Sequence, residues 1–222
     1  MDGIPFDIVA FDLDGTLVDS SGDLAAAVNF ALAEAGRPPV VPADVLPMIG
    51  GGAKNLLMKA LERSGGLPED GFKPYYKALL GYYGQNVAVH TRPYPGAIAA
   101  LDDLAAAGVK LALITNKFES FARDLLTQLD LIDRFEVFIG GDTLGKGRAK
   151  PAPDQLIAMR ERLGGGPAVY IGDSFYDVDA ARAAQMPVLL AGWGFHSGDP
   201  AELGADAVLD GYADLIPALR AL

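Results

Sequence analysis

Two aspartates stand one residue apart in the stretch FDLDGTLVDS, at positions 12 and 14. The four residues before them, IVAF at 8–11, are apolar and partly β-branched, which predicts a strand buried on both faces of a parallel sheet. Because side chains alternate along a strand, we expect the carboxylates of Asp12 and Asp14 on the same side and close together. Such a pair needs a cation, a shared proton or strong hydrogen-bond donors, and each of these suggests a functional site. The alternative is an Asp-Gly turn with solvated carboxylates.

Two further polar clusters also follow or precede predicted elements. Thr115, Asn116 and Lys117 end a predicted strand with a hydroxyl, an amide and an ammonium, which together could hold an anion. Thr and Asn equally serve as helix caps. The loop at 145–151, GKGRAKP, collects three cations that include Lys150 in an otherwise acidic chain. The alternative for this loop is a solvated basic surface.

A fourth cluster, GDSFYD, places Asp173 and Asp177 between a predicted strand and a predicted helix. Either acid could merely cap or favour the first turn of that helix. The four stretches nevertheless share one position, at or near the carboxyl ends of predicted parallel strands, where open α/β sheets bind ligands. Together they supply the acids, hydroxyl and lysine that phosphoryl transfer requires.

The elements that must position these residues follow a strand-helix rhythm. From residue 109 onward, short apolar runs alternate with helical segments, which predicts an α/β fold with a doubly wound parallel sheet. The predicted strands are 8–11, 109–114, 136–139, 168–171, 188–190 and 207–209, and the predicted helices between them include 118–129, 151–163 and 175–185.

The rhythm is interrupted after the first strand. Residues 20–88 read as consecutive helices with proline and glycine punctuation, at about 22–36, 42–48, 52–64 and 72–85. We therefore expect a helical cap domain at 18–91 inserted into a discontinuous catalytic core made of 1–17 and 92–222, with hinges at 18–21 and 87–94.

The composition excludes several classes of protein. The 29 acidic residues against 18 basic ones give a net charge of −11, which disfavours nucleic-acid binding. The chain has no cysteine, so disulfides and thiolate metal sites are excluded. No apolar run has the length of a membrane span, and the start MDGIPFD lacks the regions of a signal peptide. We expect a soluble, cytoplasmic protein without a membrane partner.

The four stretches FDLDGT, ITN, KP and GDSFYD resemble, in order and spacing, the four motifs of the haloacid dehalogenase superfamily of phosphotransferases. The resemblance covers the whole chain, and the insert is similar to that superfamily's helical cap of the first type. TNK, IGGD and AKPAPD look most like bacterial phosphoglycolate phosphatases. Phe118 and Ala152 depart from that pattern, since those enzymes often carry proline and histidine there.

The resemblance implies a role for each motif acid. Asp12 would be the nucleophile that accepts the phosphoryl group, and Asp14 the general acid and base. Mg²⁺ would be bound by the Asp12 carboxylate, the Asp14 backbone carbonyl and the Asp173 carboxylate. Asp177 would orient Lys150 and the waters of the metal, while Lys150 neutralises charge in the transition state.

The resemblance also implies the substrate contacts. Gly15, Thr16, Thr115 and Asn116 would bind phosphoryl oxygens. Lys54 follows three glycines in a stretch similar to the superfamily's specificity loop, so we expect it near a second anionic group of the substrate. These features point to a small anionic phosphomonoester, with 2-phosphoglycolate as the first choice.

Other functions stay open at this point. A sugar-phosphate phosphatase or a β-phosphoglucomutase-like phosphotransferase shares the same motifs, and pyrophosphate is a further possible substrate. A phosphate-accepting signalling receiver is the non-enzyme alternative, although the long cap and the GDSFYD acids argue against it. The oligomeric state is not predicted.

The remaining conspicuous side chains favour structural roles. Trp193 and Phe195 follow a core strand and could face the cleft or simply pack. His90 and His196 have no metal-ligand spacing, so neither receives a catalytic role.

Overall fold

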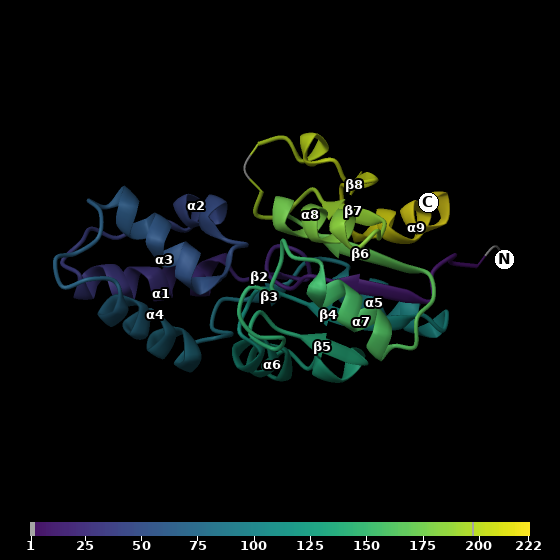
Figure 1. Ribbon diagram of the computed structural model, residues 1–222, viewed down its shortest axis with the longest axis horizontal. Helices are drawn as coiled ribbons and strands as arrows, with labels where there is room; N and C mark the ends of the chain where they lie inside the picture. Colours follow the sequence, from purple (N-terminus) through teal and green to yellow (C-terminus); the bar gives the residue numbers. More distant parts are fainter. Residues whose placement is uncertain (1–2, 197) are drawn as a thin grey trace.

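The structure, a computed structural model, describes residues 3–196 and 198–222 and contains a six-stranded parallel sheet (Figure 1). The strands lie in the order β5-β4-β1-β6-β7-β8, with β1 near the centre. The predicted α/β class with a doubly wound parallel sheet is confirmed. The strands are β1 (Ile8–Phe11), β4 (Lys110–Ile114), β5 (Val137–Ile139), β6 (Ala168–Gly172), β7 (Val188–Ala191) and β8 (Ala207–Leu209).

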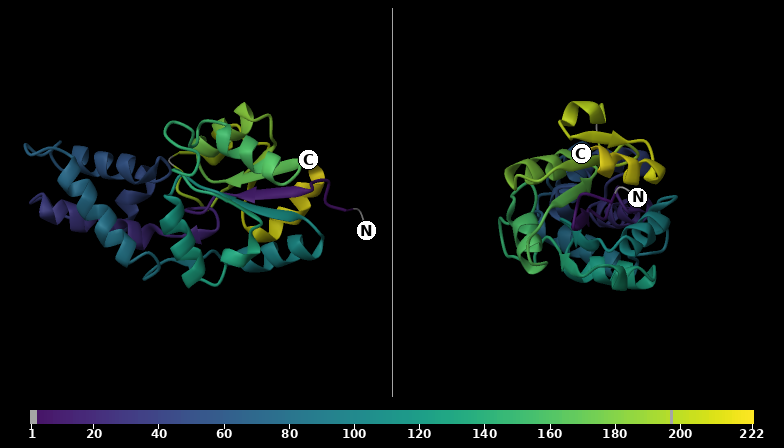
Figure 2. Two further views of the ribbon diagram at one scale, coloured as in Figure 1. Left: turned by 60° about the horizontal axis from the view of Figure 1, so that its bottom comes forward. Right: turned by 90° about the vertical axis from the view of Figure 1, so that its right-hand side faces the viewer.

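Both faces of the sheet are covered by helices, as the end-on view of Figure 2 shows. On β1, Val9 and Phe11 pack toward one apolar cluster, while Ile8 and Ala10 pack toward the other. This alternation explains why the strand is apolar at every position. The first cluster receives α5 (Ala97–Ala106), α6 (Glu119–Gln128) and α9 (Leu215–Ala221), and the second receives α7 (Asp154–Arg162) and α8 (Phe175–Ala183).

A group of helices, called the cap below, lies at one end of the molecule, and the C-terminus lies toward the other (Figure 1). Its helices are α1 (Ser21–Glu34), α2 (Pro42–Val45), the 3₁₀ helix Leu46–Met48, α3 (Gly52–Arg63) and α4 (Lys73–Gln85). The strongest packing within it joins α1 to α4. Short 3₁₀ turns also occur in the core at Ile132–Arg134, Pro200–Leu203 and Tyr212–Asp214.

The two linkers to the cap pair with each other. Strand β2 (Val18–Asp19) is antiparallel to β3 (Arg92–Pro93), so chain entry and exit form a two-stranded ribbon. The buried carboxylate of Asp23 in α1 accepts hydrogen bonds from two backbone N–H groups. The His90 N–H donates to Oδ1 and the Thr91 N–H donates to Oδ2, each at 2.9 Å. The two connections therefore hold each other in place beside the carboxyl edge of the sheet.

One predicted helix starts later than the sequence pattern suggests. Residues 151–153 form turns, and α7 begins only at Asp154, with Pro153 in the capping position. A residue that precedes a proline is disfavoured in helical geometry, which explains why Ala152 stays outside the helix. The delay leaves Lys150 on a loop rather than at a helix start.

The helices of the described residues are too short or too polar to cross a lipid bilayer.

Candidate active site

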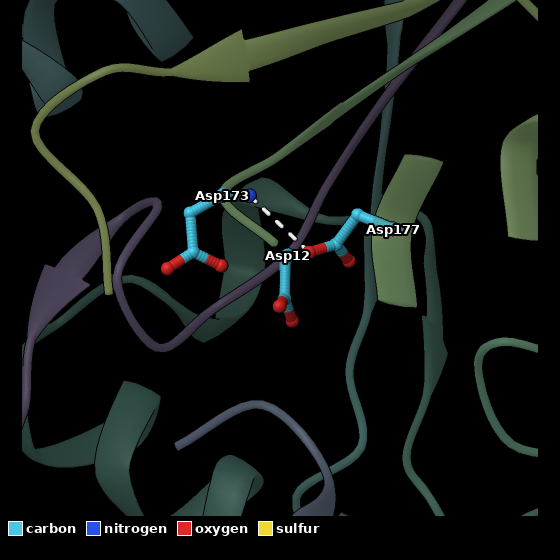
Figure 3. Close-up of side chains that lie close together, drawn as sticks. All are labelled: Asp12, Asp173 and Asp177. Carbon is cyan, nitrogen blue, oxygen red and sulfur yellow. Dashed lines mark hydrogen bonds between the residues drawn. The ribbon is translucent and has the colours of Figure 1, made fainter. Parts of the chain in front are cut away.

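Three buried carboxylates meet at the carboxyl edge of the sheet (Figure 3). Asp12 directly follows β1, Asp173 directly follows the neighbouring strand β6, and Asp177 lies in the first turn of α8. Oxygen atoms of the three groups lie within 4.8 Å of one another. Parallel pairing of β1 with β6 therefore brings together acids that are far apart in the sequence.

Lys150 supplies the positive charge of this cluster. Its ammonium lies 3.0 Å from Asp12 Oδ2 and 2.5 Å from Asp177 Oδ1, and it donates to the Tyr170 hydroxyl at 2.7 Å. Burial alone would lower the pKa of Lys150, but the carboxylates of Asp12 and Asp177 raise it above its ordinary value. The lysine is therefore charged at neutral pH, deep in the protein.

The oxygens of Asp177 are fully engaged by other groups. Besides Lys150, the Tyr170 hydroxyl contacts Oδ1, and Oδ2 accepts from the backbone N–H of Ser174 at 3.0 Å and from its hydroxyl at 2.6 Å. Asp173 N–H donates to the same oxygen, as the dashed line in Figure 3 shows. Although burial raises its pKa, Lys150 and these hydrogen bonds bring the pKa of Asp177 below the ordinary value. Asp177 thus caps α8 and holds Lys150 in position.

The other two acids carry charge that the protein compensates only in part. Burial, opposed mainly by Lys150, raises the pKa of Asp12 to about 7. Burial and the negative charges of Asp177 and Asp12 raise the pKa of Asp173 well above its ordinary value. Carboxylate oxygens are the ligands that hard divalent cations prefer. The donor set of this cluster therefore fits a divalent metal ion, which would relieve the repulsion.

Asp14 has different partners from Asp12. Strand β1 ends at Phe11, so residues 12–14 lie in a loop, and the alternation expected along a strand does not govern this pair. Both oxygens of Asp14 lie 2.6 Å from the ammonium of Lys117, and Oδ1 accepts from the Ser20 hydroxyl at 2.6 Å. The two neighbouring aspartates therefore each have a lysine of their own.

Lys117 has a different role from the one its motif suggests. The sequence marks its ammonium as part of an anion site, and the anion it contacts is the protein's own Asp14. Although burial opposes it, the charge of Asp14 raises the pKa of Lys117. The sequence contains no signal for this ion pair beyond the positive charge of Lys117, because the two residues are 103 positions apart.

Of the four residues predicted to bind phosphoryl oxygens, Thr115 and Asn116 line the cavity described below. Thr115 is buried. The side-chain amide of Asn116 donates to the carbonyls of Gly50 and Lys150, each at 2.9 Å, so it ties the cap loop to the core. The backbone N–H groups of Gly15 and Thr16 donate within the loop to Val18 and Leu13. In this state Gly15 and Thr16 therefore maintain the shape of the loop.

Gly15 also allows a close approach that no other residue would. Its φ is +80°, and a side chain on it would collide with the carboxylate of Asp173. The glycine of FDLDGT thus lets the loop that carries Asp12 pack directly against Asp173.

A cavity of about 540 Å³ lies between the core and the cap. Asp12, Asp14, Thr115, Asn116 and Lys150 line its floor. The opposite wall contains Lys54 together with mainly apolar and aromatic side chains from the cap, among them Leu56, Leu79 and Tyr83. Lys54 is exposed and lies in the first turn of α3, just after the glycine-rich loop.

Trp193 and Phe195 are packing residues, and neither lines the cavity. The Trp193 indole donates to the Thr16 carbonyl at 3.3 Å and packs against Tyr212. Phe195 is buried, and its backbone N–H donates to Asp173 Oδ2 at 2.6 Å. Their loop supports the acid cluster from behind.

Sequence reasoning missed two buried polar residues of the site. Tyr170, inside β6, donates to the Ile114 carbonyl at 2.9 Å and contacts Lys150 and Asp177. Gln155 donates to the carbonyls of Thr115 and Gly140 and accepts from the backbone N–H of Lys150 at 3.1 Å. A polar group within an apolar strand was the only available signal for Tyr170, and Gln155 gave none.

Comparison with known proteins agrees with this geometry. The model of the haloacid dehalogenase-like hydrolase family matches residues 6–185. The chain belongs to this family. A phosphoglycolate phosphatase of Agrobacterium fabrum is 37% identical over 215 residues, which cover 96% of this chain and 91% of the relative. One of Yersinia pestis is 39% identical over 213 residues, covering 95% and 92%.

Solved structures give the same result. The crystal structure of a predicted phosphoglycolate phosphatase from Haemophilus somnus superimposes with a TM-score of 0.90 at 32% identity, covering 96% of this chain and 97% of the other. A second, from Lactobacillus delbrueckii, gives 0.86 at 28% identity, covering 96% and 98%. The predicted superfamily resemblance is confirmed, and the chain is a phosphatase. A signalling receiver is thereby set aside.

Proposed function

We propose that this phosphatase hydrolyses a small anionic phosphate monoester, 2-phosphoglycolate, through an aspartyl-phosphate on Asp12. The observation that carries the proposal is the position of Asp12. Its carboxylate lies 3.0 Å from Lys150 and lines the same cavity as the second acid, Asp14. A nucleophile, a fixed cation and a proton-transfer group thus face a common space.

The reaction has two steps. In the first, an Asp12 oxygen forms a bond to phosphorus while the bond from phosphorus to the ester oxygen breaks, and Asp14 gives a proton to the departing alkoxide. In the second, water attacks the acyl phosphate, Asp14 takes the proton from that water, and phosphate leaves with regeneration of Asp12. Lys150 neutralises charge that develops on the phosphoryl oxygens, and Asp177 keeps its ammonium in place.

We further propose that the metal is Mg²⁺, held by the carboxylates of Asp12 and Asp173 and by the backbone carbonyl of Asp14. The engaged oxygens of Asp177 support an indirect role for that acid. When bound, the metal would supply charge neutralisation at the phosphoryl group. Thr115 and Asn116 would contact phosphoryl oxygens from the opposite side, and Gly15 and Thr16 would contribute by shaping the loop.

The substrate assignment rests on the cap and on the relatives. Residues 18–91 form the cap in this proposal, and Lys54 reaches the carboxylate of the substrate from the α3 terminus. The names of the curated relatives support phosphoglycolate. Sugar phosphates are the alternative, and a mutase would pass the phosphoryl group to a sugar instead of water.

The test is phosphate release by the purified protein with Mg²⁺ from a panel that contains 2-phosphoglycolate, glucose 1-phosphate, glucose 6-phosphate and pyrophosphate. We expect the highest kcat/KM for 2-phosphoglycolate. A preference for a sugar phosphate would overturn the substrate assignment. Conversion of glucose 1-phosphate to glucose 6-phosphate without net phosphate release would overturn hydrolysis.

A further inference from the structure

Lys117 stands between the second acid of the core and the helical cap. Its side chain is only 6% exposed, and its ammonium contacts both oxygens of Asp14 at 2.6 Å. The same ammonium lies 5.0 Å from the ring centroid of Tyr83, which belongs to cap helix α4. One buried cation is thus shared by a carboxylate of the core and an aromatic ring of the cap.

Tyr83 is held between the cap and the core. It is buried, and its ring packs edge-on against Phe121 of core helix α6, with ring centroids 5.5 Å apart. Its hydroxyl is buried without a hydrogen-bond partner among the described residues. Lys117 makes a cation–π contact with the ring of Tyr83, and its charge opposes the rise that burial causes in the pKa of the Tyr83 hydroxyl.

Asp14 also has a contact in the hinge. The Ser20 hydroxyl donates to Asp14 Oδ1 at 2.6 Å, and Ser20 directly precedes α1, next to strand β2. The position of the Asp14 carboxylate is therefore determined by the core through Lys117, by the cap through Tyr83 and by the linker through Ser20. A displacement of the cap changes two of these three contacts.

We propose that Lys117 is a positioning residue for Asp14 and that Tyr83 makes this positioning depend on the place of the cap. The inference rests on the proposed function, in which Asp14 transfers protons. Proton transfer demands a carboxylate within hydrogen-bond reach of the reacting oxygen, and a displacement of about 1 Å can cost about 10²-fold in rate. In this inference Lys117 acts through Asp14, because its ammonium makes short contacts to both oxygens of that carboxylate.

A double-mutant cycle with 2-phosphoglycolate tests this assignment. Lys117→Met keeps the length and apolar stem of the side chain and removes the charge. It is introduced into the wild-type chain and into Asp14→Asn, and kcat and KM are measured for all four proteins. The matched control is Lys110→Met, because Lys110 lies at the other end of the same strand β4 and donates to the Leu163 carbonyl.

In the wild-type background we expect Lys117→Met to lower kcat by about 10²-fold with KM unchanged. In the Asp14→Asn background we expect no further decrease, since the group to be positioned is gone. Lys110→Met should leave both constants unchanged. An equal decrease of kcat in both backgrounds, or an effect mainly on KM, would overturn the inference.

Two further variants keep the test valid if Lys117→Met does not fold. Lys117→Arg retains the charge and should recover part of kcat. Tyr83→Leu removes the ring from the cap and should lower kcat in the wild-type background but not in Asp14→Asn. Equal effects of Tyr83→Leu in both backgrounds would reject the link to the cap. Wild-type turnover by Asp14→Asn alone would instead reject the proposed function.

Discussion

The floor of the cavity and the opposite wall formed by the cap, called the roof here, differ in the burial of their charged groups. On the floor, Asp12 and Lys150 are buried charged groups that contact each other, and Lys150 also contacts the buried Asp177. On the roof, Lys54 is an exposed cation at the end of a glycine-rich loop, and its neighbours from the cap are mainly apolar. Charges in a buried, preorganised setting act strongly on a reacting group, whereas exposed charges are weakened by solvent. The floor is suited to chemistry and the roof to selection among substrates.

The two regions touch at a few polar points. Asn116 donates to the Gly50 carbonyl at 2.9 Å, and Asn55 of α3 donates to the Tyr176 hydroxyl at 3.2 Å. These contacts, with the β2–β3 ribbon, place the roof over the floor. Changes of the charged groups on the floor should therefore affect kcat and stability, and a change of Lys54 on the roof should affect KM.

The largest effect is expected at Asp12, the proposed nucleophile. Asp12→Asn should abolish turnover of every phosphate ester, because an amide oxygen does not replace the attacking carboxylate. Phosphate release under saturating substrate measures it. Asp7→Asn, just before the amino end of the same strand, is the matched control and should retain activity. Wild-type turnover by Asp12→Asn would remove the covalent mechanism.

Asp14→Asn should have the next largest effect, a loss of about 10²–10⁴ in kcat for each proton transfer that it impairs. A nitrophenyl ester has an acidic leaving group and needs little protonation, so this variant should still phosphorylate Asp12 and then fail to hydrolyse the intermediate. Mass spectrometry after acid quench should find a phosphate adduct on the peptide containing residue 12. An adduct on another peptide would contradict the assignment of Asp12.

The floor should also dominate stability. Lys150→Met leaves two buried carboxylates without their cation and should lower the free energy of unfolding by about 3–5 kcal/mol, measured by urea denaturation without metal. Arg182→Met is the surface control, because the side chains of Arg182 and its partner Asp206 are partly exposed, at 46% and 28%. That change should cost no more than about 1 kcal/mol. Equal losses of unfolding free energy in the two variants would show that Lys150 does not compensate the buried carboxylates of the floor.

On the roof, Lys54→Ala should raise KM for 2-phosphoglycolate roughly tenfold, the equivalent of one hydrogen bond to a charged group. KM for a neutral aromatic phosphate ester should change little, and kcat should be retained for both. An equal increase of KM for the two substrates would show that Lys54 does not contact the second anionic group.

The smallest effect concerns pH and metal. Burial raises the pKa of Asp12 from 3.8 to about 7, so between these values the folded, metal-free protein binds a proton that the unfolded chain has lost. Its stability should therefore fall as the pH rises through this window. Asp177, whose pKa is lowered, contributes stability throughout the window and loses it only at lower pH.

Mg²⁺ should reverse this loss, because it binds the ionised carboxylates. The Tm gained on adding Mg²⁺ to chelator-treated protein should be larger at pH 8 than at pH 5, and Asp173→Asn should remove the gain. A gain of the same size at both pH values would contradict the proposed ligands.

The sequence by itself determined which motif acids come together and where. Short apolar runs with helices between them favour a parallel sheet, and parallel strands end at one edge, so Asp12 and Asp173 were predictable as neighbours. The period of the hydrophobic pattern also located the six strands to within one residue at each end. These properties depend on local periodicity and connectivity, which a single sequence displays.

Only the tertiary structure decided which charge faces which. The pairing of Asp14 with Lys117, the contact of Tyr83 with that lysine, and the places of Tyr170 and Gln155 beside Lys150 join residues that are distant in sequence. The sequence motif placed two aspartates side by side, but the end of β1 at Phe11 turned them toward different lysines. Side-chain direction in a loop depends on the packing of every element around it, and no spacing rule along the chain contains that information.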